Sequence, residues 1–213
     1  MALGAALLFL VQPMIAKMAL PALGGSPAVW NTSMVFFQAA LLAGYAYAHA
    51  ATRWLRPAAQ VVLHGCLLAS AFAVLPLVLA PEASVGSGGS AVVHLLRALA
   101  ASVGLPFFVL AATAPLLQRW IGAEDPYFLY AASNVGSFLA LVSYPFVVEP
   151  LSRLGDQTRA WSVGFFVLIA LIIGLSILLA VLLVLTVVYY VRRERESGLG
   201  EGLTERDEAD RED

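Results

Sequence analysis

Long apolar runs separated by short polar joints dominate the chain. A helix that crosses a bilayer needs about 20 apolar residues. Six runs reach this length, at about residues 3–20, 28–50, 58–80, 91–117, 126–148 and 161–191. The pattern predicts an all-α, polytopic membrane bundle of about six transmembrane helices within residues 1–191. The sixth run has no charged residue and would be about 45 Å long, so it must tilt or extend past the hydrocarbon.

Two polar segments fall outside these runs. Residues 192–213 are charged and poor in apolar side chains. Such a segment cannot bury enough apolar surface to order itself, so we expect a disordered tail there. The segment PEASVGSGGS at 81–90 has the composition of a flexible linker. Its GSGGS follows a helix and lacks the lysine of a phosphate-binding loop, which favours a plain linker.

The joints also carry helix-start signals. Ser26-Pro27 and Asp125-Pro126 each place a capping residue before a proline at the first helical position. Pro57 can begin the third helix in the same way. These signals support the division into separate spans.

The composition identifies the bilayer as the solvent of these helices. Hydrophobic residues make up 61% of the chain and charged residues 12%, with a mean hydropathy of +0.85. A soluble domain carries about twice that share of charge. No basic patch with interleaved aromatic residues occurs, so we expect no nucleic-acid partner. Cys66 is the single cysteine, which excludes a disulfide within one chain. The three histidines lack ligand spacing, so we expect neither a metal nor a cofactor.

Basic residues near the run ends predict the orientation. Six arginines would lie on the side that holds both termini: Arg53, Arg56, Arg119, Arg192, Arg193 and Arg195. Arg153 and Arg159 would lie on the other side, offset by Glu149 and Asp156. The positive-inside rule then places both termini, and the tail, in the cytoplasm of a bacterial cell, with the helices in its inner membrane. The tryptophans are expected at the interfaces that bound the spans: Trp30, Trp54, Trp120 and Trp161.

A few polar residues interrupt the apolar runs. Lys17 is an intramembrane charge and therefore a candidate functional residue. One interpretation is that Lys17 extends toward the headgroups or pairs with Glu149 at the end of the fifth helix. The other is that Lys17 and Gln12 face a cavity and bind a polar or anionic ligand. Gln38 and Asn134 can join that site or bond between helices, as Gln118 and Ser133 can. The candidate ligand-binding set is Gln12, Lys17, Gln38, Asn134 and Glu149.

Prolines and glycines within the runs predict bends and close helix contacts. The prolines are Pro13, Pro106, Pro115 and Pro145, and the glycines are Gly44, Gly104 and Gly136. Proline removes a backbone hydrogen bond, and glycine lets two backbones approach. No nucleophile lies near a base, and no pair of carboxylates occurs within the runs. We therefore expect no catalytic residue and no enzyme activity from this chain.

Three stretches, QPMIAKMALPALGG, SVGLPFFVLAATAPLLQRW and DPYFLYAASNVGSFLALVSYPFVVEPL, carry a family resemblance. In the same order, they resemble the N-terminal membrane region of bacterial proteins described as fused major-facilitator/spermidine-synthase-like. The resemblance covers most of residues 5–161. It implies half of a major-facilitator transporter, which would pair with a second half, most simply as a homodimer.

In full-length members of that family a domain like spermidine synthase follows the membrane region. This chain has neither the glycine-rich nucleotide loop nor the acidic residues of that domain. Aminopropyl transfer would therefore need a separate synthase-like partner. Two functions stay open: a transporter-like domain for a small polar solute, or a non-transporting anchor or scaffold that recruits a soluble synthase-like enzyme.

Overall fold

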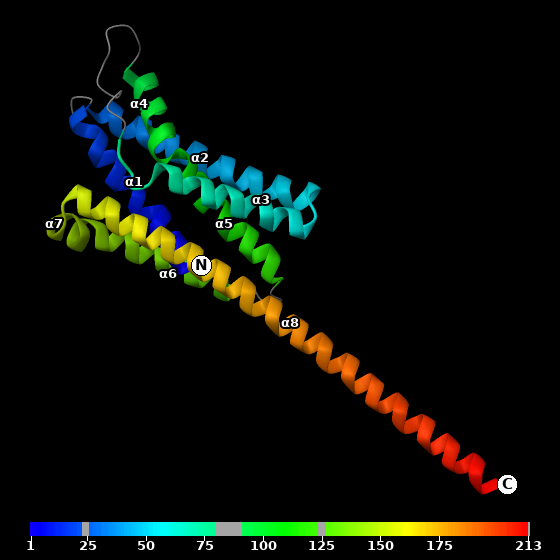
Figure 1. Ribbon diagram of the computed structural model, residues 1–213. Coiled ribbons are helices and arrows are strands. Elements are labelled where there is room, and N and C mark those ends of the chain that lie inside the picture. The colour runs from blue at the N-terminus through cyan, green and yellow to red at the C-terminus, as the bar shows by residue number, and fades with distance from the viewer. Residues whose placement is uncertain (23–25, 80–90, 123–126, 213) are drawn as a thin grey trace. The chain divides into compact units, whose positions relative to one another are not determined.

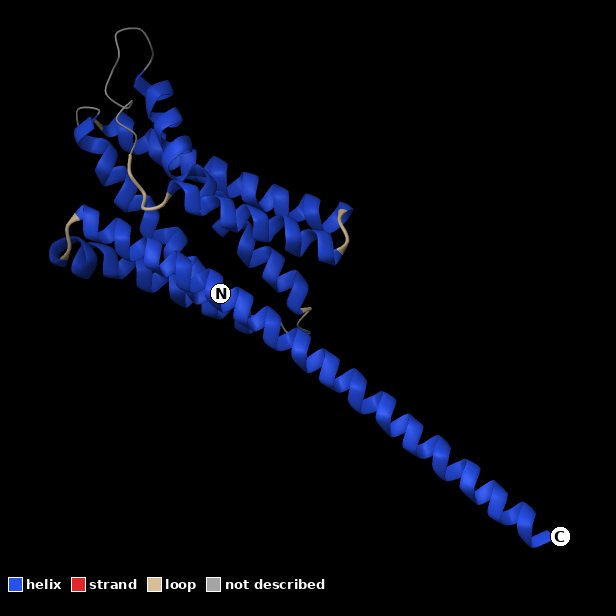
Figure 2. Cartoon of the chain, viewed as in Figure 1, coloured by secondary structure: helices blue, strands red, loops and turns tan. Residues whose placement is uncertain are grey.

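A computed structural model describes residues 1–22, 26–79, 91–122 and 127–212, and in these ranges the chain consists of helices and short connections without a strand (Figure 2). The elements are α1 (Ala2–Ala22), α2 (Pro27–Trp54), α3 (Pro57–Ser70), η1 (Ala71–Val74), α4 (Ala91–Leu99), η3 (Ala100–Gly104), α5 (Leu105–Ile121), α6 (Tyr127–Ser143), η4 (Tyr144–Val148), α7 (Glu149–Leu151) and α8 (Leu154–Glu212) (Figure 1). The short 3₁₀ turn η1 and the π-helical segments η3 and η4 continue neighbouring α-helices.

Six of the resulting helices are long and apolar enough to cross a membrane, within the described ranges. They are Ala2–Pro21, Pro27–Trp54, Pro57–Val74, Ala91–Ile121, Tyr127–Leu151 and Leu154–Arg193. The predicted all-α bundle of six apolar helices is therefore confirmed. This is the architecture of a multi-pass membrane protein.

The chain divides into two compact units, Met1–Leu168 and Ile169–Asp213. In the second unit the apolar side chains described between Ile169 and Val191 are mostly exposed, as expected for a surface that faces hydrocarbon. The sequence predicts disorder from residue 192, whereas the structure continues α8 to Glu212. Glutamate and arginine are good helix formers, and a helix that has already formed extends without a new nucleus.

Within the first unit, four contacts fix the relative directions of two pairs of helices. α1 and α6 are parallel, because Ala2 lies against Gly136 and Lys17 pairs with Glu149. α3 is antiparallel to α5, because Gln60 bonds Trp120, whereas His64, which comes later in α3, bonds Thr113, which comes earlier in α5. Figure 1 shows α2, α3 and α5 side by side, in agreement with their contacts.

Two glycines allow the closest helix contacts. A Cβ at Gly136 would lie 2.2 Å from the carbonyl oxygen of Ala2. A Cβ at Gly44 of α2 would lie 2.7 Å from Cβ of Ala111 in α5. Both distances are too short for any side chain, so the predicted close contacts at these two positions are confirmed. At Gly104 the nearest atom is 3.6 Å away, which is an ordinary contact.

The prolines act in two ways. Pro145 lies within the π-helical segment η4, and Pro106 is the second residue of α5, just after η3. A π turn absorbs the missing hydrogen-bond donor by widening the helix. Pro13 and Pro115 lie inside α1 and α5, whose α-helical structure continues past them. The predicted interruption therefore occurs at two of the four positions.

Several predicted boundaries differ from the structure. The third helix ends at Val74 rather than near residue 80, because the residue before a proline avoids the helical region. Leu75 is extended, and its bond to Pro76 is cis. Pro27 and Pro57 begin their helices as predicted, although Ser26 makes no side-chain cap bond. The predicted cap at 125–126 and the linker at 81–90 lie outside the described residues.

Trp161 was predicted to lie at an interface and to begin the sixth helix, and the second part of this prediction is wrong. α8 begins at Leu154, and the Trp161 side chain is buried. Its indole Nε1 donates a 2.8 Å hydrogen bond to the carbonyl oxygen of Leu7 in α1. A buried indole N–H needs an acceptor, and the neighbouring helix supplies it.

Replacing Gly136 with valine should destabilise the bundle, because the new side chain collides with the backbone of α1 rather than with a movable side chain. Overpacking of this kind costs about 1–3 kcal/mol. The thermal unfolding midpoint in lipid nanodiscs should fall by several degrees. The control is Gly65→Ala in α3, where a Cβ meets no atom within 4 Å. An unchanged midpoint for Gly136→Val would contradict the close contact.

Candidate functional site

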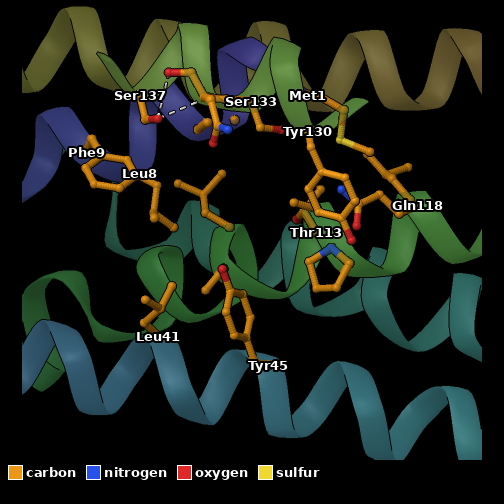
Figure 3. Close-up of a pocket in the computed structure, with 18 of the residues that line it drawn as sticks. Met1, Leu8, Phe9, Leu41, Tyr45, Thr113, Gln118, Tyr130, Ser133 and Ser137 are labelled. Atoms are coloured by element: carbon orange, nitrogen blue, oxygen red, sulfur yellow. Dashed lines mark hydrogen bonds between the residues drawn. The ribbon is translucent and has the colours of Figure 1, made fainter. Parts of the chain in front are cut away.

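Two cavities lie among the helices of the first unit. The first, here called the neutral cavity, has a volume of about 450 Å³ and is lined by α1, α2, α5, α6 and the first part of α8 (Figure 3). No Asp, Glu, Lys or Arg side chain lines it among the described residues. Its hydrogen-bonding side chains are Tyr45, Thr113, Gln118, Tyr130, Ser133, Asn134 and Ser137. A cavity of this size with such groups is typical of small-molecule sites.

The serines of α6 differ in how they are satisfied. The Ser137 hydroxyl lies 3.1 Å and 3.0 Å from the carbonyl oxygens of Ser133 and Asn134 in its own helix, as Figure 3 shows. The Ser133 hydroxyl is buried and has no hydrogen-bond partner among the described residues. A buried hydroxyl without a partner is costly, so Ser133 has a donor and acceptor to offer.

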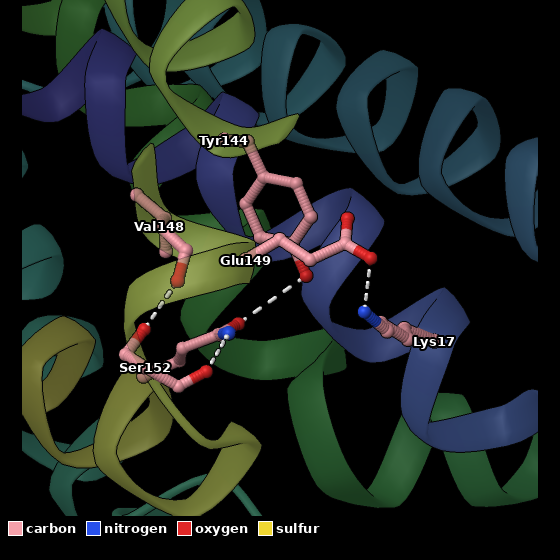
Figure 4. Close-up of polar contacts among 6 residues, drawn as sticks. Lys17, Tyr144, Val148, Glu149 and Ser152 are labelled. Carbon is pink, nitrogen blue, oxygen red and sulfur yellow. Dashed lines mark hydrogen bonds and ion pairs between the residues drawn. The ribbon is translucent and has the colours of Figure 1, made fainter. Parts of the chain in front are cut away.

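The second cavity, here called the ion-pair cavity, has a volume of about 490 Å³. Lys17 of α1 and Glu149 of α7 form a salt bridge in its wall (Figure 4). Both side chains are about two-fifths exposed, at 41% and 42%. The sequence left this pairing open as one alternative, and the structure contains it. Gln12 lines the same cavity, and its amide donates a 3.3 Å bond to the Leu8 carbonyl of its own helix.

The π-helical segment η4 positions Glu149. Tyr144, the first residue of η4, is buried, and its hydroxyl donates a 3.2 Å hydrogen bond to the Gln157 side chain of α8. The Gln157 amide in turn donates to the carbonyl of Ser152 at 3.1 Å, as Figure 4 shows. These bonds tie the end of the fifth span to the start of α8. Glu149 follows η4 directly and therefore has a fixed support.

The predicted ligand-binding residues divide between the two cavities. Gln12, Lys17 and Glu149 meet in the ion-pair cavity, whereas Asn134 lines the neutral cavity. Gln38 is exposed on α2 and lines neither of them. The structure thus brings together three of the five predicted residues.

One face of each of three helices lines both cavities. On α6 and its continuation η4, Tyr130, Asn134 and Ser137 line the neutral cavity, and Leu141 and Tyr144 line the ion-pair cavity. These residues follow one another at spacings of three or four, so they form one stripe along the helix.

The same holds for α1 and α2. On α1, Ala5 and Leu8 line the neutral cavity and Gln12 the ion-pair cavity, and on α2 the corresponding residues are Leu41 and Met34. Phe9 lines both cavities. The two cavities therefore follow each other along the bundle, with the Phe9 side chain at the level where they meet. Gln38 lies four residues after Met34, at this same level of α2.

A buried polar cluster between α3 and α5 was missed by the sequence analysis. His64 is 2% exposed, and its Nε2 lies 3.0 Å from the Thr113 hydroxyl. Thr113 donates its own proton to the Val109 carbonyl at 2.6 Å, so His64 carries its proton on Nε2 and donates to Thr113. One turn away, Trp120 Nε1 donates a 2.9 Å bond to the Gln60 side chain.

The cluster leaves two polar atoms without a described partner, Nδ1 of His64 and the hydroxyl of Tyr47. The rings of these residues stack with centroids 6.1 Å apart. The signal in the sequence was the spacing of Gln60 and His64, four residues apart in an otherwise apolar helix, which places both on one face. Because Thr113 also lines the neutral cavity, the cluster supports part of its wall.

Within the described residues, no group of three His, Cys, Asp or Glu side chains could hold a metal ion. Hydrogen-bonding side chains and one ion pair are the polar groups that the two cavities offer. Comparisons of the chain with protein-family models, with curated proteins and with solved structures found no match.

The coupling between Lys17 and Glu149 is measurable by a double-mutant cycle with Lys17→Met and Glu149→Gln. Each single variant should lower stability, and the double variant should lower it less than the sum of the two. Because both side chains are partly exposed, we expect a coupling of about 0.5–1 kcal/mol. The matched control is the more exposed pair Asp156 and Arg159, at 3.8 Å, which should show almost none. Equal coupling in both cycles would contradict a special role for the cavity pair.

Proposed function

We propose that the chain is a transporter-like domain of a bacterial inner membrane that binds a small polar solute between α1, α2 and α6. One observation carries the proposal: two cavities follow each other along the bundle, and the same face of each of these helices lines both. In secondary transporters the substrate binds between helices within the membrane and reaches each side in turn, and two cavities that follow each other along the bundle are compatible with such a path.

The polar lining supports this proposal. Polar side chains inside a membrane are expensive unless they pair with each other or line a cavity. Tyr130, Ser133 and Asn134 of α6 line one cavity, whereas an exposed position of the same helix, Phe138, is apolar. Polarity is therefore concentrated where a solute would pass. The volumes of both cavities suit a small metabolite rather than a polymer.

The predicted orientation, which rests on the arginine distribution, assigns each cavity to one side of the membrane. With both termini in the cytoplasm, Met1 and Gln118 place the neutral cavity toward the cytoplasmic side. Lys17 and Trp30 place the ion-pair cavity toward the opposite side. In this proposal the two ends of the path differ in charge.

The family resemblance adds a mechanism and a context. Six helices correspond to half of a major-facilitator transporter, so we propose that two copies pair and rock about the site near Lys17 and Gln12. Counting fluorescently labelled subunits in single active liposomes should give two. One subunit per active liposome would contradict the homodimer.

Polyamine metabolism is the context that the resemblance suggests, although a protonated Lys17 disfavours direct binding of a polycation there.

A second candidate function is a scaffold that recruits a soluble synthase-like enzyme. The observation that favours it is the length of α8. From Ile169 to Glu212 the helix extends about 66 Å, roughly twice the hydrocarbon thickness. Its charged last residues would stand in water, where a partner could bind. Co-purification of an enzyme with the full chain, lost when the chain ends at Arg193, would support this function.

Solute flux into liposomes is the test of the transporter proposal. Purified protein would be reconstituted, and uptake of labelled amino acids, polyamines and small organic anions would be followed. Ser137→Trp places a bulky side chain in the neutral cavity and should reduce uptake of a transported solute at least tenfold. Phe138→Trp, one residue along α6 and 64% exposed, should leave the uptake rate within about twofold of the wild type.

The thermal midpoint of each variant shows whether it is folded. Asn134→Leu, which removes polarity at nearly constant size, is the second variant if the tryptophan prevents folding. Uptake equal to that of empty liposomes for every solute would contradict the transporter proposal. Uptake that is unaffected by both cavity variants would contradict the proposed path.

A further inference from the structure

The ion-pair cavity contains one cation and one carboxylate, and its charges cancel. Glu149 is the partner that the described part of the chain provides for the Lys17 ammonium, and Lys17 is the partner for the Glu149 carboxylate. The salt bridge uses one of the two carboxylate oxygens of Glu149. The Lys17 ammonium has three donors, so both groups keep hydrogen-bonding capacity for a ligand.

The charge balance restricts the ligand class. A simple anion that binds Lys17 would leave Glu149 without its partner and give the cavity a net negative charge. A simple cation that binds Glu149 would leave Lys17 unpaired in the same way. Uncompensated charge is unfavourable next to hydrocarbon. A ligand with one ammonium and one acid group can replace both partners at once and keeps the net charge at zero.

The rest of the lining is suited to an apolar substituent. Phe9, Leu20, Trp30 and Met34 surround the ion pair from α1 and α2. Gln12 adds a side-chain carbonyl that can accept a hydrogen bond from a primary ammonium. The volume of about 490 Å³ leaves room for a ligand larger than glycine.

We propose that the ion-pair cavity binds a zwitterion with a primary ammonium, an acid group and an apolar substituent. The acid group pairs with Lys17, the ammonium pairs with Glu149 and Gln12, and the apolar part lies against Phe9 and Trp30. This inference deepens the proposed function and rests on it for the role of the site in transport. Two sources share this chemistry: a free apolar amino acid, and the headgroup of phosphatidylethanolamine.

Three ligands of similar shape test whether binding requires both charged groups of the zwitterion. Leucine, 4-methylpentanoate and 3-methylbutylamine share one apolar body, but the second lacks the ammonium and the third lacks the acid. Binding to the full chain would be measured by calorimetry in nanodiscs of phosphatidylcholine, whose quaternary ammonium cannot donate a hydrogen bond. Leucine should bind at least about tenfold more tightly than either analogue, because each analogue leaves one charge unpaired.

Substitutions of Lys17 and Glu149 test whether leucine binds at the ion pair. Lys17→Met and Glu149→Gln should each weaken leucine binding about tenfold or more. The double variant K17M/E149Q has no unpaired charge, so it keeps the test valid if a single variant does not fold. It should lose the preference for leucine over the two analogues. The charge-swapped variant K17E/E149K should keep part of this preference, which a purely structural salt bridge would not explain.

Changing the lipid of the nanodiscs distinguishes a free amino acid from the headgroup of phosphatidylethanolamine. Nanodiscs with phosphatidylethanolamine should raise the apparent Kd for leucine in the wild type if the headgroup occupies the cavity. Leucine binding without competition assigns the site to a free amino acid, and competition shows that the headgroup binds there as well. Either result supports the zwitterion.

The inference is overturned if neither leucine nor the lipid binds better than the single-charge analogues. It is also overturned if K17M/E149Q retains the preference. Its failure can be distinguished from failure of the proposed function. Leucine binding without flux of any solute would overturn transport alone, whereas flux of another solute without leucine binding would overturn only the zwitterion.

Discussion

Inside a bilayer, each polar group must find its partner within the protein, and this constraint determines much of what α1 does. Hydrocarbon offers no hydrogen bond to Gln12 or Lys17. Gln12 uses the Leu8 carbonyl of its own helix, and Lys17 uses Glu149 from the fifth span. The Leu7 carbonyl accepts the Trp161 indole from α8. α1 is thereby connected to the fifth and the sixth spans through polar contacts.

These contacts need closely spaced backbones, which small residues provide. Lipid removes the hydrophobic driving force between helices, so packing and hydrogen bonds have to replace it. At Gly136 the backbone of α6 touches that of α1, and about four turns further along Lys17 pairs with Glu149. A close contact at one end and a charged contact at the other keep the two helices in one register. The same register places the stripes of both helices along the two cavities.

Some of these features could be predicted from the sequence because they depend on local composition. Run length and hydropathy predict the six helices, and an isolated charge in such a run directs attention to Lys17 and to Glu149 as its partner. Other features depend on which helices become neighbours. The hydrogen bond of Trp161 could not be predicted, because its acceptor, the Leu7 carbonyl, is more than 150 residues away in the sequence. His64 was dismissed because its partner Thr113 lies on another helix. Pro76 was overlooked although its local effect, an extended Leu75, ends the third span.

The two cavities differ in the charge of their side chains, and this difference determines which solutes each of them could bind. The neutral cavity offers hydroxyls and amides, which adapt to many uncharged polar groups, and a buried Ser133 hydroxyl that still lacks a partner. The ion-pair cavity offers two fixed charges of opposite sign, and charged groups left unpaired penalise a mismatched ligand strongly. Selection would therefore occur mainly at Lys17 and Glu149, and the neutral cavity would accept what has been selected. Phe9 lines both cavities, so in the proposed path a solute would pass this side chain on its way from one cavity to the other.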